Sequence, residues 1–154
     1  MKTRATAIFT TAVTLTLAIA VLFAVNGPVN GAPKDKPGIF INITSGEDNL
    51  HAVSMALGLA KMSIEHGHKV VVFLNVHAPV FASKSFSADV KLADFPPVKQ
   101  MLADAVDKGA TVMVCDHCAS VCNVQAADLI EGTTVSSHGD ILEQLESGMV
   151  CFSY

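Results

Sequence analysis

Apolar runs separated by polar segments recur along most of the chain and predict a series of strands. The first three runs are continuous rather than alternating, which is typical of strands buried on both faces of a parallel sheet. Two shorter apolar runs follow towards the end of the chain. The five predicted strands are residues 38–44, 69–76, 110–115, 133–136 and 149–153.

Between these runs, apolar residues recur at steps of three and four, which is the spacing of one face of a helix. The pattern predicts long helices over 49–66 and 97–108, each followed by a glycine. Glycine commonly ends a helix because it adopts positive φ without strain. Shorter helices are predicted over 118–129 and 140–146. The only long stretch without a regular pattern is 77–95.

Strands that alternate with helices predict βαβ units and a parallel sheet with helices on both faces. The expected fold class is therefore α/β, a three-layer α/β/α sandwich around a mostly parallel five-stranded sheet.

The beginning of the chain is predicted to lie outside this domain. Two basic residues occur within the first four positions, and an uncharged apolar run follows over 5–25. This order is typical of an export signal, and the run also has the roughly 20 residues that a membrane-spanning helix needs. We expect residues 1–27 to be a signal peptide or an N-terminal membrane anchor, 28–37 a linker, and 38–154 one folded domain. The domain would be periplasmic, or anchored to the outer face of the cytoplasmic membrane through 5–25 if that run is uncleaved.

The charge of the domain argues against partners that carry many phosphates. The eight basic residues that follow Arg4 are all lysines, against 14 acidic residues. Nucleic acid binding usually requires a basic face, and phosphate recognition often uses arginine. The sequence also lacks the GxGxxG and GxxxxGK[ST] motifs. We therefore expect no nucleic acid partner and no cofactor.

Titratable residues follow four of the predicted strands. In open parallel sheets, ligands bind beyond the carboxyl ends of the strands, so these residues are candidates for a site. Asp48, His77, His117 and His138 come after the first to the fourth strand in turn. Each also has an ordinary explanation, since Asp48 can cap a helix and His138 can be an exposed loop residue. Their convergence at one edge makes them possible supporting residues.

Three of the four cysteines lie within eight residues of each other. Cys115 and Cys118 fall where a buried strand turns into a helix, and backbone N–H groups and the helix dipole at such a turn are expected to lower a thiol pKa. The thiolate is the reactive form in nucleophilic sulfur chemistry, disulfide exchange and soft-metal binding. Cys115 and Cys118 are thus the candidate catalytic residues. Cys122, one helical turn further on, is predicted to face either the site or the core and is a further possible supporting residue. Cys151 is expected to be buried in the last strand.

Several of these segments together resemble the DsrE/DsrF-like family. They are the strand and helix start GIFINITSGEDN, the Cys-x-x-Cys turn, the stretch ADLIEG at 127–132, and the final FSY. The resemblance covers 38–154 and implies a parallel-sheet α/β/α fold and assembly into homotrimers, hexamers or related hetero-oligomers. For this chain we expect a homotrimer or homohexamer. The resemblance also implies that Cys115 carries sulfur as a persulfide. Many exported members have Cys-Pro-x-Cys at this turn, whereas this chain has Asp116 in place of the proline and adds Cys122.

The leading hypothesis is an exported thiol protein that binds or relays sulfane sulfur. Cys115 would carry the persulfide, and Cys118 would resolve it or store sulfur as a disulfide or trisulfide. Its partner would be a sulfur donor or acceptor, either a protein or a small sulfur compound. Such exchange needs an accessible thiolate and no metal, so any enzymatic activity would be that of a sulfurtransferase.

Two alternatives remain open from the residues alone. Cys115, Cys118, Cys122 and His117, with Met113 and Met149, offer soft ligands suited to copper or zinc, although C-x2-C-x3-C is not a standard zinc spacing. The other alternative is a structural oligomer subunit with a Cys115–Cys118 disulfide.

Overall fold

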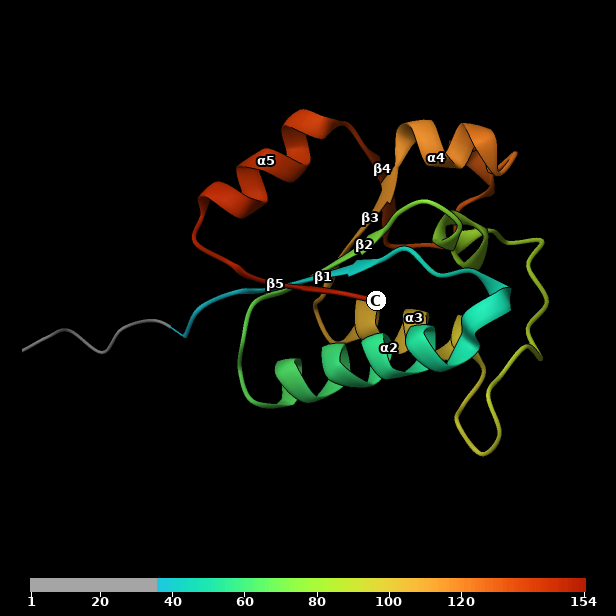
Figure 1. The fold of residues 1–154 in the computed structure, drawn as a ribbon, viewed down its shortest axis with the longest axis horizontal. Helices are drawn as coiled ribbons and strands as arrows, with labels where there is room; N and C mark the ends of the chain where they lie inside the picture. The colour runs from blue at the N-terminus through green and yellow to red at the C-terminus, as the bar shows by residue number, and fades with distance from the viewer. Residues whose placement is uncertain (1–35) are drawn as a thin grey trace, which may run out of the picture. The chain divides into compact units, whose positions relative to one another are not determined.

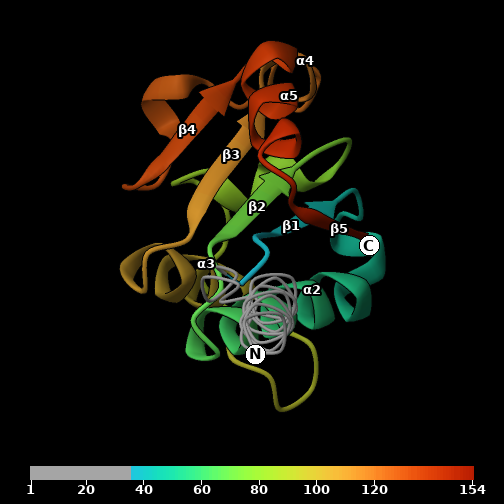
Figure 2. The same ribbon diagram turned by 90° about the vertical axis from the view of Figure 1, so that its left-hand side faces the viewer.

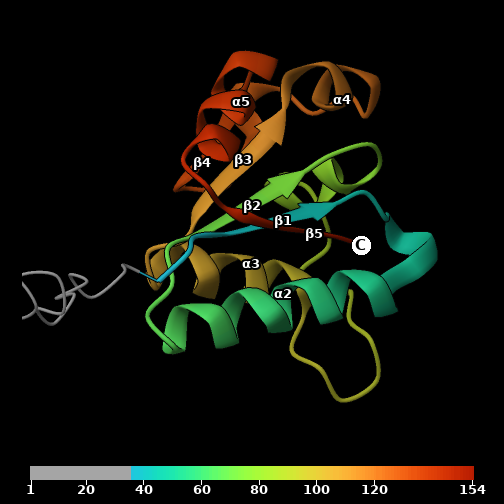
Figure 3. The same cartoon turned by 60° about the vertical axis from the view of Figure 1, so that its left-hand side comes forward.

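The computed structural model describes residues 36–154. Five strands form one sheet in the order β4-β3-β2-β1-β5, and every neighbouring pair is parallel. Helices α2 and α3 lie on one side of this sheet, and α4 and α5 lie on the other (Figures 1–3). The predicted three-layer α/β/α fold is therefore confirmed. The strands are β1 (Ile39–Ile43), β2 (Val70–Leu74), β3 (Thr111–Cys115), β4 (Thr133–Ser136) and β5 (Val150–Ser153).

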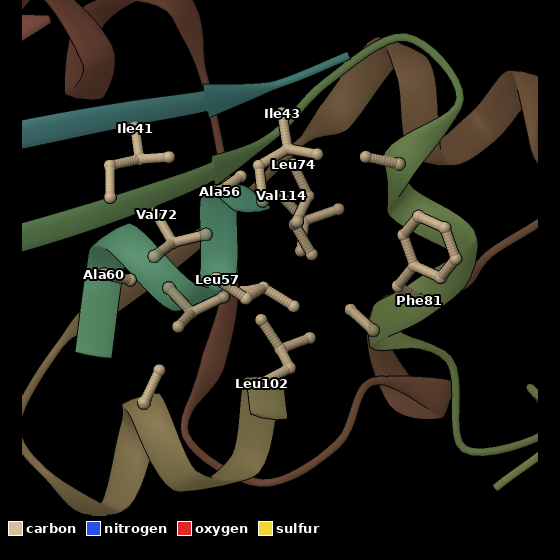
Figure 4. Packing of buried hydrophobic residues seen from close by; sticks show 14 of the residues in the cluster. Ile41, Ile43, Ala56, Leu57, Ala60, Val72, Leu74, Phe81, Leu102 and Val114 are labelled. Atoms are coloured by element: carbon tan, nitrogen blue, oxygen red, sulfur yellow. The ribbon is translucent and has the colours of Figure 1, made fainter. Parts of the chain in front are cut away.

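Helices α2 (Leu50–Glu65) and α3 (Val98–Asp107) hold the larger core against the sheet. Alternate residues of the inner strands, such as Ile41, Val72 and Val114, point towards them and are almost fully buried (Figure 4). Gly67 and Gly109 end these helices at positive φ, as their positions in the sequence predict.

The opposite face of the sheet has a smaller cluster, which places Cys115 among apolar side chains. This cluster contains Phe40, Val71, Phe73, Met113 and Cys115. It is covered by α4 (Asp116–Val121) and α5 (His138–Glu146), and α5 itself has no buried residue. The layer over Cys115 is therefore thin compared with the layer on the other side.

The third predicted helix, 118–129, and the predicted irregular stretch, 77–95, differ from the sequence interpretation. The predicted helix over 118–129 begins earlier and ends at Val121, because Asn123 adopts a positive φ of 56° and reverses the chain. The N–H groups of Asn123 and Val124 then bond to Ser120 O and Ala119 O, the pattern of a Schellman motif with asparagine in place of glycine. A separate 3₁₀ turn follows at Ala126–Asp128. The stretch 77–95, predicted to be irregular, starts with another 3₁₀ helix at Ala78–Ala82, whose Phe81 is buried.

The expected signal or anchor, the apolar run 5–25 and most of the linker lie outside the described residues. No helix within 36–154 has the length and apolar character to cross a membrane.

Candidate functional site

Cys115 is the last residue of β3 and the N-cap of α4. Its side chain is 7 % exposed and belongs to the apolar cluster beneath α5. The backbone N–H of Cys118 donates to Cys115 Sγ at 3.4 Å. The strand-to-helix turn thus supplies one hydrogen-bond donor to the sulfur, while the surrounding side chains shield it from water.

The expected low thiol pKa at this turn is wrong for Cys115. Burial raises the pKa of the Cys115 thiol above its usual value, and the Cys118 side chain adds to this effect. The bond from the Cys118 backbone N–H lowers the pKa but does not outweigh burial. The sequence shows the turn and its donors, but not how deeply the sulfur lies in the fold.

Cys118 and Cys122 lie one helical turn apart and bond to two consecutive residues that follow β2. The Cys118 thiol donates to Asn75 Oδ1 at 3.1 Å, and the Cys122 thiol donates to the Val76 carbonyl at 3.5 Å. Both side chains are half-buried. All three clustered thiols therefore lie where β3 and α4 meet the end of β2.

Asn75 is a site residue that the sequence analysis missed, because the predicted strand ran on to Val76. The observed strand ends at Leu74. Val76 then adopts a positive φ of 54°, which is rare for a β-branched residue, and Asn75 Oδ1 accepts from its N–H at 2.9 Å. Such strain is found most often at functional sites. The polar asparagine directly after a buried apolar run was the available signal.

Two hollows open beside the cysteines. One, of about 220 Å³, is lined by Phe73, Asn75, Cys115, His138, Ile141 and Leu142, so its walls are mostly apolar. The other, of about 320 Å³, is lined by Glu47, three serines and Asn123 together with Cys122, Val80, Phe86 and Val124, so many of its walls are polar. Cys115 lines the first hollow and Cys122 the second.

The four supporting candidates are divided among different places. His138 lines the hollow beside Cys115. Asp48 Oδ1 accepts from the Gly46 N–H at 3.2 Å, and the Cβ of His77 lies close to Gly46, so these two residues shape the loop after β1. His117 is exposed on α4, and its backbone N–H bonds to the Asp116 carboxylate.

Cys151 is exposed, which corrects the expectation that it is buried in the last strand. The strand itself is present, but β5 is an edge strand and all four of its residues are exposed. An apolar run alone does not reveal whether a strand has a neighbour on both sides.

The structure does not favour the two alternative site chemistries. Within residues 36–154, no group of three or more His, Cys, Asp or Glu side chains is arranged to hold a metal ion. All four cysteines in that range are free thiols.

Comparison with known proteins agrees with this fold. The model of the DsrE/DsrF-like family matches residues 38–152. Among solved structures, the chain is similar to the YchN protein from E. coli, at 15 % identity and a TM-score of 0.60, over 77 % of this chain and 100 % of that one. It is also similar to MTH1491 from Methanobacterium thermoautotrophicum, at 14 % identity and a TM-score of 0.57, with the same coverage of both chains. A comparison with curated proteins gave no match.

Proposed function

We propose that this chain, which belongs to the DsrE/DsrF-like family, binds sulfane sulfur as a persulfide on Cys115 and passes it on. The family is associated with sulfur relay in general. The observation that carries the proposal is a thiol at the carboxyl end of an inner parallel strand, in a hollow of its own and beside two more thiols. Ligands of open parallel sheets bind at this edge.

The chemistry requires only thiols and a donor that already contains sulfane sulfur. The Cys115 thiolate attacks a terminal sulfur of an inorganic polysulfide, one S–S bond of the polysulfide breaks, and the shortened polysulfide leaves with the electron pair. The Cys118 N–H that donates to Cys115 Sγ supports the negative charge on the sulfur before attack. The small apolar hollow suits a small donor at Cys115 better than a protein surface, since Cys115 is only 7 % exposed.

Export and assembly form part of the same proposal. The apolar run 5–25 after a basic start supports an exported domain, periplasmic or anchored at the outer face of the cytoplasmic membrane. Exposed apolar side chains, among them Met62 and Phe152, support a homo-oligomer, and the family resemblance favours a trimer or hexamer. The sulfur acceptor is a thiol compound or a thiol protein.

The test is loading with polysulfide followed by mass spectrometry. Cleavage before aspartate is well suited to this chain, because Asp116 separates Cys115 from the other two clustered cysteines. We expect the alkylated 107–115 peptide to gain the mass of one sulfur atom, and Cys115→Ser and Cys115→Ala to lose this gain. Two variants are needed because serine buries a hydroxyl among apolar side chains, which destabilises the fold.

Cys151→Ser is the matched control, since Cys151 is exposed on β5 and outside the thiol cluster. It should load Cys115 like the parent. If the 107–115 peptide of the parent gains no sulfur, or if folded Cys115→Ala protein loads as much sulfur as the parent, Cys115 is not the carrier.

A further inference from the structure

We propose that Cys122 is the exit thiol of a three-cysteine relay, so that sulfur loaded on Cys115 moves through Cys118 to Cys122 and leaves to a small polar thiol. This inference rests on the proposed function, because it needs a persulfide on Cys115. It adds a direction of transfer, a role for the third cysteine and a chemical class for the acceptor.

The first support is the shared anchoring of the thiols. The Cys118 backbone N–H contacts Cys115 Sγ, and the Cys118 thiol bonds to Asn75 Oδ1. The Cys122 thiol bonds to the carbonyl of the next residue, Val76. Cys118 and Cys122 are four residues apart, so their side chains share one face at the end of α4. Cys118 is thus next to Cys115 in the turn after β3, and its thiol and that of Cys122 are anchored to consecutive residues after β2.

The second support is that Cys115 and Cys122 open into different hollows. Cys115 faces the hollow of about 220 Å³ that Phe73, Ile141 and Leu142 line. Cys122 lines the separate hollow of about 320 Å³. Cys115 does not line that second hollow, and Cys122 does not line the first. A sulfur atom that enters on one side can therefore leave on the other without the donor and acceptor meeting.

The walls of the second hollow indicate what it accepts. Ser83, Ser85 and Ser87 supply hydroxyl groups, Asn123 supplies an amide, and Glu47 supplies a negative charge. No basic residue lines it. Such walls favour an uncharged thiol that carries hydroxyl or amide groups and disfavour an anionic thiol, because Glu47 would repel a carboxylate.

The segment 83–87, which carries the three serines of this hollow, is held in place by Lys84 and Lys99. Lys84 Nζ donates to the Ala127 carbonyl at 2.8 Å. Lys99 Nζ donates to the carbonyls of Lys84 at 2.6 Å and Phe86 at 2.9 Å. Because these ammonium groups bond to carbonyl groups of the chain, they hold the serine-bearing segment 83–87 in place, and neither lysine lines the hollow.

Each transfer step is balanced without an oxidant or reductant. The Cys118 thiolate attacks the outer sulfur of the protonated Cys115 persulfide, the S–S bond to Cys115 Sγ breaks, and Cys115 leaves as a thiolate. The Cys115 thiolate then takes up a proton, which offsets the proton that Cys118 lost. The same exchange moves the sulfur to Cys122 and finally to the acceptor thiol, which leaves as a persulfide.

The experiment follows the sulfur after a short pulse of polysulfide to the full chain. Cleavage before Asp116 and Asp128 separates the 107–115 peptide, with Cys115, from the 116–127 peptide, with Cys118 and Cys122. In the parent we expect sulfur to appear first on 107–115 and then on 116–127. In Cys118→Ser, sulfur should stay on 107–115. In Cys122→Ser and Cys122→Ala, transfer of sulfur to added 2-mercaptoethanol should be lost while loading of Cys115 persists.

A second experiment tests whether the negative charge of Glu47 selects the acceptor thiol at the hollow of Cys122. The parent should pass sulfur to uncharged 2-mercaptoethanol faster than to 3-mercaptopropionate, which is similar in size but anionic. Glu47→Gln should reduce this preference, because it removes the negative wall and keeps the side-chain size. Cys151→Ser, whose thiol is outside the cluster, should behave like the parent in every measurement.

The outcomes separate the relay from the proposed function. Absence of sulfur from 107–115 in the parent would contradict loading at Cys115. Normal loading of Cys115 together with parent-like transfer from folded Cys122→Ala would overturn the relay and leave the loading step intact. Sulfur that reaches 116–127 at the parent rate in Cys115→Ala would contradict the proposed direction, because Cys118 or Cys122 would then load without Cys115.

Discussion

At the scale of single residues, burial controls the chemistry of Cys115 more than its place at a turn does. The Cys118 N–H favours the thiolate, but the apolar cluster around the sulfur disfavours a charge more strongly. The resting thiol is therefore protonated at neutral pH. A buried, protonated thiol resists chance oxidation, because the thiolate is the reactive form.

This raised pKa predicts the pH dependence of the Cys115 reaction. Alkylation requires the thiolate, so the rate should rise with pH and reach half of its maximum at a higher pH than that of N-acetylcysteine. The measurement is the alkylated fraction of the 107–115 peptide after a fixed time with iodoacetamide at each pH. A half-maximal rate at or below the pH found for N-acetylcysteine would show that the turn, and not burial, dominates.

The raised pKa of Cys115 also affects the stability of the fold, which it lowers as the pH rises. Below the pKa of the unfolded thiol, both states hold the proton and the shift has no effect. As pH rises above that value, the unfolded chain loses its proton while folded Cys115 keeps it, so the shift destabilises the fold. As the pH rises, the reactivity of Cys115 therefore increases while the stability of the fold decreases.

The sequence predicted the position of Cys115 at the end of a strand. It predicted neither the exposure of Cys151 nor the contact between Cys118 and Asn75. A continuous apolar run that ends at Cys115 shows where the strand ends, because a buried strand needs such a run. The exposure of Cys151 could not be predicted, since it depends on β5 lying at the edge of the sheet. Asn75 was missed because the turn after β2 depends on the positive φ of Val76, which the residue type disfavours.

At the scale of elements, α5 covers the site, and a hydrogen-bonded cap fixes its beginning. Ser137 Oγ accepts from the Asp140 N–H, and the Asp140 carboxylate accepts from the Ser137 N–H at 2.7 Å, which forms a capping box. The Ser137 hydroxyl also donates to the Asp140 carboxylate at 2.8 Å, and this bond together with the one from the Ser137 N–H lowers the pKa of Asp140. The first turn they secure carries His138 and Ile141, both of which line the hollow beside Cys115.

Removing this cap should loosen the cover of the hollow. For Ser137→Ala, we expect amide exchange in α5 to become roughly fivefold faster, since an N-cap serine contributes about 1 kcal/mol. Exchange in α2, on the other face of the sheet, is the internal reference. The Asp140 bonds are present above the pKa of the unfolded carboxyl and are lost as pH falls through its lowered folded pKa, so acid should loosen the parent helix as well. Unchanged exchange in α5 of the variant would show that the cap does not hold this helix.

The end of a helix could be predicted from the sequence where a glycine follows it, and it could not be predicted where an asparagine does. Gly67 and Gly109 end α2 and α3 at the expected places. Asn123 ends α4 in the same manner, but asparagine is common enough elsewhere that its position gave no clear stop. The consequence for the site is direct, because the early end of α4 puts Cys122 at the helix terminus, where its thiol reaches Val76.

At the scale of the whole domain, the two sides of the sheet differ in the residues that they carry. The α4–α5 side holds Cys115 and Cys118, whereas Cys122 packs against the edge of the main core. The α2–α3 side holds the main core, and its outer surface has an apolar hollow of about 560 Å³. Met55, Met62, Met101 and Phe95 line this hollow, with charged residues such as Lys61 and Asp104 among them. Met55 and Met62 are 46 % and 58 % exposed.

We expect the domain to form a homo-oligomer through the α2–α3 side, because burying this apolar surface against another copy would stabilise the assembly. Met62→Glu should shift the mass measured by light scattering at micromolar concentration to that of a monomer, since it places a charge within the hollow. Leu142→Glu on α5 is the matched control, with a side chain 57 % exposed against 58 % for Met62. It should keep the oligomer, because Leu142 lies on α5, on the other side of the sheet from the α2–α3 surface. A monomeric parent would remove the claim of assembly, and loss of the oligomer only in Leu142→Glu would place the interface on the side that carries the thiols.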